Sequence, residues 1–265
     1  MKSSPLISVI TVCYNEEKGI EKTCESIVNQ SNKNFEWIVI DGKSTDGTLD
    51  IIGKYKKQIG YFVSEKDRGV YDAMNKGISK SSGKYLLFLN GGDSFVEKNI
   101  LEKVSSFIKK DKLQSEIYYG NAIYGNGEVV DFSKAVLNKS FFLNKTISHQ
   151  ATFIKRQLFQ KYGNYNPNYK IVADFDFWVK AIVKNKIKTK YLPIAVSIFN
   201  LEGIGSNYKL AKKQIEERNA VLQKYKLITP AEARIAKIKW FLLAILKKME
   251  IYNIIRKGYR KVIKR

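Results

Sequence analysis

The sequence predicts an α/β fold with a mostly parallel sheet and flanking helices, and three observations support this prediction. Short apolar runs alternate with helical patterns over residues 5–95, as is typical of strands joined by right-handed helical crossovers. The chain has 265 residues, of which 44% are hydrophobic, so it can bury a substantial core. Polar turn residues follow each apolar run, as at the ligand-binding edge of a Rossmann-like sheet.

The parallel strands are predicted at four short runs, residues 6–13, 34–40, 61–64 and 85–89. The last run is apolar throughout, which is typical of a strand buried on both faces. It stops at Asn90-Gly91-Gly92-Asp93, where two glycines allow a sharp turn. Because parallel strands share one carboxyl edge, we expect the side chains that follow them to meet there, namely Tyr14, Asp41, Arg68 and Asp93.

Helices are predicted between these strands. Residues 20–28 carry apolar side chains at helical spacing, and the acidic pair Glu16-Glu17 suits the first turn of that helix. Further helices are expected from Leu49 and over residues 70–79. Turn-favouring and capping residues fill the segment 41–48, in which Asp46 is interpreted as a helix cap.

The strict alternation ends after Asp93. A hairpin is predicted around Gly125-Asn126-Gly127, between strands at 117–124 and 128–132. The other expected elements are a helix over 100–108, a strand-like run over 148–154, a short helix over 158–162, an amphipathic helix over 174–184 and a strand over 189–199.

The net charge of +22 is concentrated in a tail. Residues 208–265 hold 17 of the 47 Lys and Arg but only 4 of the 25 Asp and Glu. They are predicted to form basic amphipathic helices, one over 210–225 and another from Pro230, where Thr229 and Glu232 make a capping pattern. A basic tail favours polyanionic partners such as anionic lipid, lipid diphosphates or nucleic acid.

The remaining composition sets further bounds. No stretch approaches the roughly 18–20 apolar residues of a membrane span, and the N-terminal run is expected to be a strand, not a signal peptide. Cys13 and Cys24 lack the spacing of metal ligands, so we expect buried free thiols in a reducing compartment.

Ordered segments carry a family resemblance: ISVITVCYNEEKGIEKTCESIVNQS, FEWIVIDGKSTDGTLDII and SEKDRGVYDAMNKGISKSSGKYLLFLNGGDSF. Over residues 6–199 the chain resembles family 2 glycosyltransferases, which have the GT-A fold. The segments HQATFIKR and YKIVADFDFW resemble bacterial enzymes of exopolysaccharide, colanic-acid-type and lipopolysaccharide assembly. The resemblance implies a catalytic domain over 1–207, with a nucleotide-sugar-binding half (5–95) and an acceptor half (96–207), followed by a basic helical extension over 208–265.

The nucleotide is expected at the ends of the first strands. Tyr14 can stack on a uracil-like ring, and the resemblance implies that Asp41 accepts a hydrogen bond from the base. Glu16 is expected at the ribose, and Arg68 can grip phosphate oxygens in a bidentate way. The alternatives are ordinary surface turns for Tyr14 and Asp41, and a solvated charge beside Asp67 for Arg68.

The segment VYDAMNKG is implied by the resemblance to line the donor-sugar pocket. Asp72 and Asn75 are assigned to this pocket, and they share one helix face with Lys76. For Lys76 we favour simple exposure to solvent.

Asp93 resembles the last acid of the family's Asp-x-Asp motif. In that role it would bind Mg²⁺ or Mn²⁺, which takes up charge developing on the leaving UDP. The chain departs from the motif, because Asn90-Gly91-Gly92-Asp93 has only one carboxylate. The alternative is an ordinary turn in which Asp93 bonds nearby backbone amides.

Asp174 is our candidate for the base that takes the proton from the acceptor hydroxyl, with Asp176 in reserve. The alternative for Asp174 is a helix N-cap. His149 is the only histidine. It is expected near the diphosphate or acceptor, with local backbone bonding and metal ligation as the other interpretations.

These expectations combine into an inverting, hexosyltransferase-type glycosyltransferase (EC 2.4) at the cytoplasmic face of the cell membrane. It would move one sugar from a nucleotide-sugar, a UDP-sugar by expectation, to a lipid-linked glycan acceptor. The apolar stretch from Trp240 to Leu246, flanked by lysines, is expected to lie in an anionic membrane surface. The alternative is packing of this helix on the catalytic domain or within a homodimer.

Two other function classes remain open. One is a catalytically silent nucleotide-sugar-binding or scaffold protein, which the single acid of the metal motif favours. The other is a nucleic-acid binder, which only the charge suggests. The sequence has no basic face interleaved with aromatic residues, so no nucleic-acid partner is expected.

Overall fold

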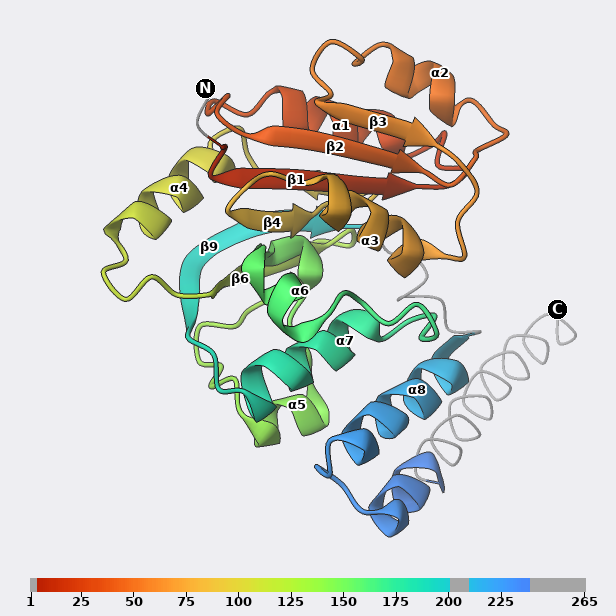
Figure 1. Ribbon diagram of the computed structural model, residues 1–265, viewed down its shortest axis with the longest axis vertical. Coiled ribbons are helices and arrows are strands. Elements are labelled where there is room, and N and C mark those ends of the chain that lie inside the picture. The colour runs from red at the N-terminus through yellow and green to blue at the C-terminus, as the bar shows by residue number, and fades with distance from the viewer. Residues whose placement is uncertain (1–3, 201–209, 239–265) are drawn as a thin grey trace, which may run out of the picture.

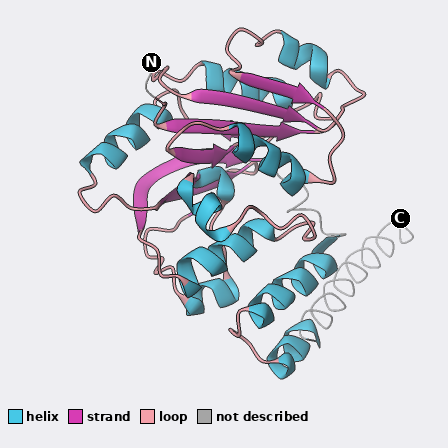
Figure 2. Ribbon diagram, in the orientation of Figure 1, coloured by secondary structure: helices cyan, strands magenta, loops and turns pink. Residues whose placement is uncertain are grey.

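The protein is built on one nine-stranded sheet with helices on both faces (Figures 1 and 2). The computed structural model describes residues 4–200 and 210–238. The strand order is β3-β2-β1-β4-β8-β6-β9-β5, and β7 pairs with β6. The predicted α/β class is confirmed.

The first half of the sheet is parallel, as predicted. Its strands are β1 (Ile7–Cys13), β2 (Glu36–Asp41), β3 (Tyr61–Ser64) and β4 (Tyr85–Phe88). The connecting helices are α1 (Ile20–Val28), α2 (Thr48–Gly53) and α3 (Val70–Lys80). Helix α1 begins at Ile20, so the prediction that Glu16-Glu17 form its first turn is wrong. The backbone carbonyl of Glu16 instead accepts hydrogen bonds in the turn that leads into the helix.

The second half of the sheet is mixed. Strand β6 (Ile117–Tyr124) forms the predicted hairpin with a shortened β7 (Val129–Val130), and it also pairs antiparallel with β8 (Thr152–Lys155) and parallel with β9 (Thr189–Phe199). Strand β5 (Ser94–Phe95) pairs with β9 at the far edge. The helices are α4 (Ile100–Lys110), α5 (Lys139–Asn144), α6 (Gln157–Tyr162) and α7 (Ala173–Trp178).

Two predicted elements of this half need correction. The expected strand-like run over 148–154 begins as a 3₁₀ turn, η1 (His149–Ala151), and becomes a strand only at Thr152. The expected helix over 174–184 is α-helical only to Trp178 and continues as a π-helix, η2 (Val179–Lys184). Helix α5 was not predicted. Its cap is Asn138, whose side chain accepts from the Phe141 amide.

The strands separate two hydrophobic cores, because successive side chains of a strand point to opposite faces. Ile10 and Phe88 face the core under α3, α6 and α7, whereas Val9 and Leu87 face the core under α1 and α4. Helix α3 approaches β1 closely at Gly77. A Cβ there would lie 2.4 Å from Ile10 Cγ2, so this contact requires glycine.

Helix α8 (Ala211–Lys224) packs beside α7 on the side away from the sheet (Figure 1). The buried Glu217 carboxylate accepts from the backbone amides of Lys170 and Ile171, at 2.9 Å each. The Arg218 guanidinium lies 4.0 Å from the centre of the Phe175 ring. Helix α8 therefore holds both the loop before α7 and α7 itself.

A further helix over 230–238 follows α8. It begins with the predicted capping pattern, because the Thr229 amide donates to Glu232 Oε2 at 2.7 Å and the Glu232 amide donates to Thr229 Oγ1 at 3.2 Å. The apolar stretch from Trp240 to Leu246 lies outside the described residues. In the described part of the chain, no helix has the length and apolar character of a membrane span.

The neighbouring acids Glu217 and Glu216 give a matched test of the α8 contact. Glu217→Ala removes the acceptor of two amides and should lower the free energy of unfolding by about 2–3 kcal/mol. Glu216 pairs with Lys237 at 3.1 Å and is 37% exposed, so Glu216→Ala should change it by less than about 0.5 kcal/mol. Urea unfolding measures both values, and equal losses would contradict the role given to Glu217.

Candidate active site

The loops after β1 and β2 are joined by hydrogen bonds at the carboxyl edge of the sheet. The Asn15 amide donates to Ser44 Oγ and the Glu16 amide to Thr48 Oγ1, both at 2.8 Å. In return, the Asn15 side chain accepts from the Thr45 amide at 2.9 Å. These two loops form one rigid surface, on which the predicted nucleotide residues lie.

Tyr14 stands at this edge with 62% of its surface exposed. Its backbone neighbour across the edge is Gly42, where a Cβ would lie 3.3 Å from Tyr14 Cβ and 2.6 Å from Asp67 Oδ2. The loops after β1, β2 and β3 therefore meet at Gly42. The exposed Tyr14 ring is available to stack on a planar ligand.

Asp41 is fully buried at the end of β2. Its carboxylate accepts from the Ser44 amide at 2.9 Å, from Ser64 Oγ at 2.6 Å and from Ser44 Oγ. The Cys13 thiol lies beside it, and burial together with Asp41 raises the pKa of that thiol. Asp41 thus orders the edge, and its predicted contact with a nucleobase stays a prediction.

Glu16 lies over the turn that follows β4. A Cβ on Gly91 would meet Glu16 Cγ at 2.8 Å, and one on Gly92 would meet Glu16 Oε1 at 2.9 Å. Gly92 also has φ +86°, which side chains rarely adopt. The two glycines therefore allow the first and fourth loops to touch.

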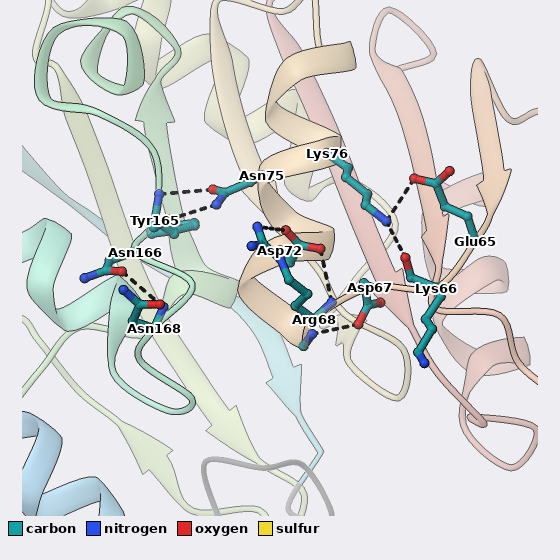
Figure 3. A network of polar contacts seen from close by, with 11 residues as sticks. Glu65, Lys66, Asp67, Arg68, Asp72, Asn75, Lys76, Tyr165, Asn166 and Asn168 are labelled. Atoms are coloured by element: carbon teal, nitrogen blue, oxygen red, sulfur yellow. Dashed lines mark hydrogen bonds and ion pairs between the residues drawn. The ribbon is translucent and has the colours of Figure 1, made fainter.

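Helix α3 carries the next group of predicted residues (Figure 3). Arg68, just before the helix, pairs with Asp72 at 3.0 Å while its own side chain stays 77% exposed. Asp72 also accepts from the Arg68 amide at 3.1 Å. Lys76 is not simply exposed, because it pairs with Glu65 at 2.9 Å and is 25% accessible.

Asn75 holds the loop between α6 and α7 (Figure 3). Its Nδ2 donates to the Tyr165 carbonyl at 2.8 Å, and its Oδ1 accepts from the Tyr165 amide at 3.0 Å. Both polar atoms of the Asn75 side chain are therefore bonded to the backbone of Tyr165. In this arrangement Asn75 fixes the segment that leads to Asp174.

Asp174 is held from three sides at the start of α7. Its Oδ1 accepts from the Phe175 amide at 2.8 Å and lies 3.0 Å from the buried Tyr71 hydroxyl. Its Oδ2 lies 3.1 Å from His149 Nδ1. The side chains of Asp174 and His149 are each 15% exposed, so this pair is ordered but reachable.

Asp176 has a different environment. It is 3% exposed and pairs with Lys224 of α8 at 2.9 Å. The two candidate acids therefore face apart, Asp174 toward His149 and Asp176 toward α8.

His149 also contacts the turn after β4. Its Nε2 lies 3.3 Å from Asn90 Nδ2. The histidine thus links the end of β4 to the start of α7, which are far apart in the sequence.

Asp93 is 3% exposed and accepts from the Asn200 amide at 2.9 Å. Burial raises the pKa of its carboxyl to about 6, although hydrogen bonds from Asn200 and Gln150 work against this shift. No group of three or more His, Cys, Asp or Glu suited to a metal occurs among the described residues. A buried carboxylate with these partners does not fit the role of a ready metal ligand.

Several residues of this network were not singled out from the sequence: Tyr71, Asn90 as a partner of His149, Gln150, Asn200 and Glu217. Tyr71 and Glu217 bond backbone groups of the loop before Asp174. Their partners are remote in sequence, so no local pattern marks them. The position of Tyr71 within the VYDAMNKG segment was the only feature of the sequence that pointed to a role for this residue.

Comparisons with known proteins agree with this architecture. The chain is 33% identical over 208 residues to a PGL/p-HBAD biosynthesis glycosyltransferase of Mycobacterium bovis (strain BCG / Pasteur 1173P2), covering 77% of this chain and 80% of that protein. It is 39% identical over 107 residues to the putative teichuronic acid biosynthesis glycosyltransferase TuaG of Bacillus subtilis (strain 168), covering 39% of this chain and 42% of that protein.

Solved structures share the fold. The S. aureus TarS 1–349 structure in complex with UDP-GlcNAc matches with a TM-score of 0.64 at 22% identity, covering 89% of this chain and 71% of that chain. The mannosyltransferase PcManGT from Pyrobaculum calidifontis, in complex with GDP-Man and Mn²⁺, matches with a TM-score of 0.65 at 18% identity, covering 86% of this chain and 66% of that chain. The fold is GT-A, as expected. The model of glycosyl transferase family 2 matches residues 8–170, and the chain belongs to this family of glycosyltransferases.

Proposed function

We propose that the protein is an inverting glycosyltransferase that moves one sugar from a UDP-sugar to a lipid-linked glycan in cell-surface polysaccharide synthesis. The observation that carries this proposal is Asp174, an ordered carboxylate that remains 15% exposed and that His149 links to the turn after β4. The names of the relatives, from PGL/p-HBAD and teichuronic acid biosynthesis, support a surface glycan as the product. The UDP-bound TarS structures support the choice of nucleotide.

Asp174 Oδ2 is the atom that we assign to the acceptor proton. Oδ1 accepts from the Phe175 amide and lies 3.0 Å from the Tyr71 hydroxyl, whereas Oδ2 has His149 as its only partner among the residues that the structure describes. In an in-line displacement the acceptor oxygen bonds to the anomeric carbon as the bond to the diphosphate breaks, and the hydroxyl proton passes to the carboxylate. Asp176 stays in reserve, but its ion pair with Lys224 argues against it.

The nucleotide binds, in this proposal, along the joined loops. Tyr14 stacks on the base, Asp41 reads its edge, Glu16 contacts the ribose, and Arg68 contacts the diphosphate. The exposures of Tyr14 (62%) and of the Arg68 side chain (77%) support the first and last of these roles.

The donor-sugar and acceptor pocket is proposed to include Asp72, Asn75 and His149. Asp72 lies beside Arg68 at the start of α3, and His149 lies beside the proposed base. Asn75 contributes through the loop that it holds.

A divalent cation accompanies GDP-Man in the PcManGT structure. The environment of Asp93 does not support it as the residue that holds such an ion in this chain, because the carboxylate is buried and bonded to Asn200. Arg68 is the side chain we assign to the charge on the leaving diphosphate.

The acceptor and location are proposed from the basic C-terminal segment. Residues 208–265 carry 17 Lys and Arg against 4 Asp and Glu, which favours the anionic inner face of the cell membrane. On the helix over 230–238, Ile235 and Ile238 are 51% and 53% exposed. Packing of this helix in a homodimer is the other outcome.

A catalytically silent nucleotide-sugar-binding protein is the second candidate, favoured by the single acid in Asn90-Gly91-Gly92-Asp93. A screen of nucleotide-sugars for UDP release, with extracted glycolipid as acceptor, separates the two. Donor binding without turnover would favour the silent protein.

Asp174→Asn should lower kcat by about 10²–10⁴-fold, because the acceptor proton loses its base. Donor affinity should be unchanged. Asp176→Asn is the control and should keep most turnover while weakening the contact with Lys224. Steady-state kinetics and calorimetric donor titration measure both. Full turnover in Asp174→Asn would remove Asp174 from the mechanism.

Asp93→Asn tests the environment of the buried acid. With a carboxyl pKa of about 6 in the folded state, against about 3.9 unfolded, the wild type holds its full stability below about pH 4 and loses up to ~3 kcal/mol between about pH 4 and about pH 6. The variant should escape this loss, so its advantage in melting temperature should grow from about pH 4 to about pH 6 and then level off. Loss of metal-dependent UDP affinity, without this trend, would instead identify a metal ligand.

Deletion of residues 231–265 should release the protein from vesicles that contain anionic lipid, because most of the basic tail is lost. Sedimentation with anionic and with neutral vesicles measures this binding. The truncated protein keeps α8, so UDP release from a UDP-sugar in the presence of a soluble acceptor serves as the control for folding. Unchanged vesicle binding would assign the tail to packing.

A further inference from the structure

We propose that Asn90 and His149 are positioning residues for Asp174, and that Asn90 keeps the Nε2 nitrogen of His149 unprotonated. The role of Asp174 as base rests on the proposed function, but the contacts among the three side chains do not.

The three side chains form a continuous chain of contacts. Asn90 Nδ2 lies 3.3 Å from His149 Nε2, and His149 Nδ1 lies 3.1 Å from Asp174 Oδ2. They come from the turn after β4, from η1 and from α7. This series of contacts therefore connects the turn after β4 with the segment that carries the proposed base.

The hydrogen-bond chemistry fixes the form of the histidine. A carboxylate only accepts, so the nitrogen that faces Asp174 must be Nδ1–H. In a neutral ring, Nε2 is then an acceptor, and it needs a donor opposite. Asn90 presents its Nδ2–H group there. The neutral Nδ1–H form of His149 satisfies both neighbours at once.

An acid at position 90 would select a different form. A carboxylate opposite Nε2 requires a proton on that nitrogen too, so it favours the doubly protonated ring. Asn90 avoids this because an amide offers a donor. Its Oδ1 is buried and has no hydrogen-bond partner among the described residues, so the amide is retained here for its nitrogen.

His149 in turn limits the freedom of Asp174. Its Nδ1–H holds Oδ2, while the Phe175 amide donates to Oδ1, which also lies 3.0 Å from the Tyr71 hydroxyl. The carboxylate plane is fixed, and one lone pair of Oδ2 is left for an acceptor hydroxyl. Removal of such a supporting hydrogen bond typically costs 10–100-fold at a site that depends on orientation.

Nitrogen-15 NMR of the imidazole ring tests the proposal directly, because His149 is the only histidine in the chain. The full-length protein at neutral pH should show a protonated Nδ1 and an unprotonated Nε2. Asn90→Ala leaves Asp174 opposite Nδ1, so Nδ1 should stay protonated, whereas Asn90→Asp should protonate both nitrogens. A wild-type ring with a protonated Nε2, or no change in Asn90→Asp, would overturn the proposal.

Two substitutions of His149 separate positioning from general packing. The amide nitrogen of Asn can occupy the place of Nδ1, whereas that of Gln reaches the place of Nε2. His149→Asn should therefore keep kcat within roughly tenfold, and His149→Gln should lose about 100-fold. Equal losses in the two variants would contradict the assigned hydrogen bond.

The two kinds of failure are distinguishable. Full turnover of Asp174→Asn would remove the proposed base while leaving the NMR result intact. The wrong ring form in the wild-type spectrum would overturn the role of Asn90 even if Asp174 is the base. Melting temperatures of all variants identify losses that come from unfolding.

Discussion

The anchoring of the loop between α6 and α7 determines where the proposed base lies. Helix α3 holds this loop through Asn75 and Tyr71, and α8 holds it through Glu217. All three contacts bind backbone groups, so they fix the path of the chain whatever side chains the loop carries. Asp174 follows this loop directly in the sequence, so the same contacts fix its position. Without anchors on both sides, the carboxylate would have no fixed distance to the nucleotide edge.

The carboxyl edge of the parallel strands, where the nucleotide is proposed to bind, is ordered by hydrogen bonds between its loops. We call it the nucleotide edge. The loops after the parallel strands bind one another through hydrogen bonds such as that from the Asn15 amide to Ser44, and they approach closely at Gly42 and Gly91. Beneath this surface, the Asp41 carboxylate accepts hydrogen bonds from Ser44 and Ser64. The site therefore joins two ordered parts, a self-bonded nucleotide edge and an anchored loop, and His149 is the side chain that contacts both.

The sequence was sufficient for the parallel strands, because their apolar runs and turn residues are local signals. The topology of parallel sheets also allowed the prediction that Tyr14, Asp41 and Asp93 lie at one edge. It could not reveal the burial of Asp93 or the pairing of Asp176 with Lys224, since each depends on a partner that is remote in the chain. The 3₁₀ turn at His149 was missed because its flanking residues favour strands. The roles of Asp174 and His149 in catalysis stay predictions.

The position of α8 has a consequence for how the protein is made. The matched family region ends at residue 170, yet Glu217 and Lys224 hold the segment just beyond it. A nascent chain can complete the nucleotide edge long before α8 leaves the ribosome. On the proposed function, a product truncated before residue 217 would bind the donor but lack the α8 contacts that order the segment around the proposed base.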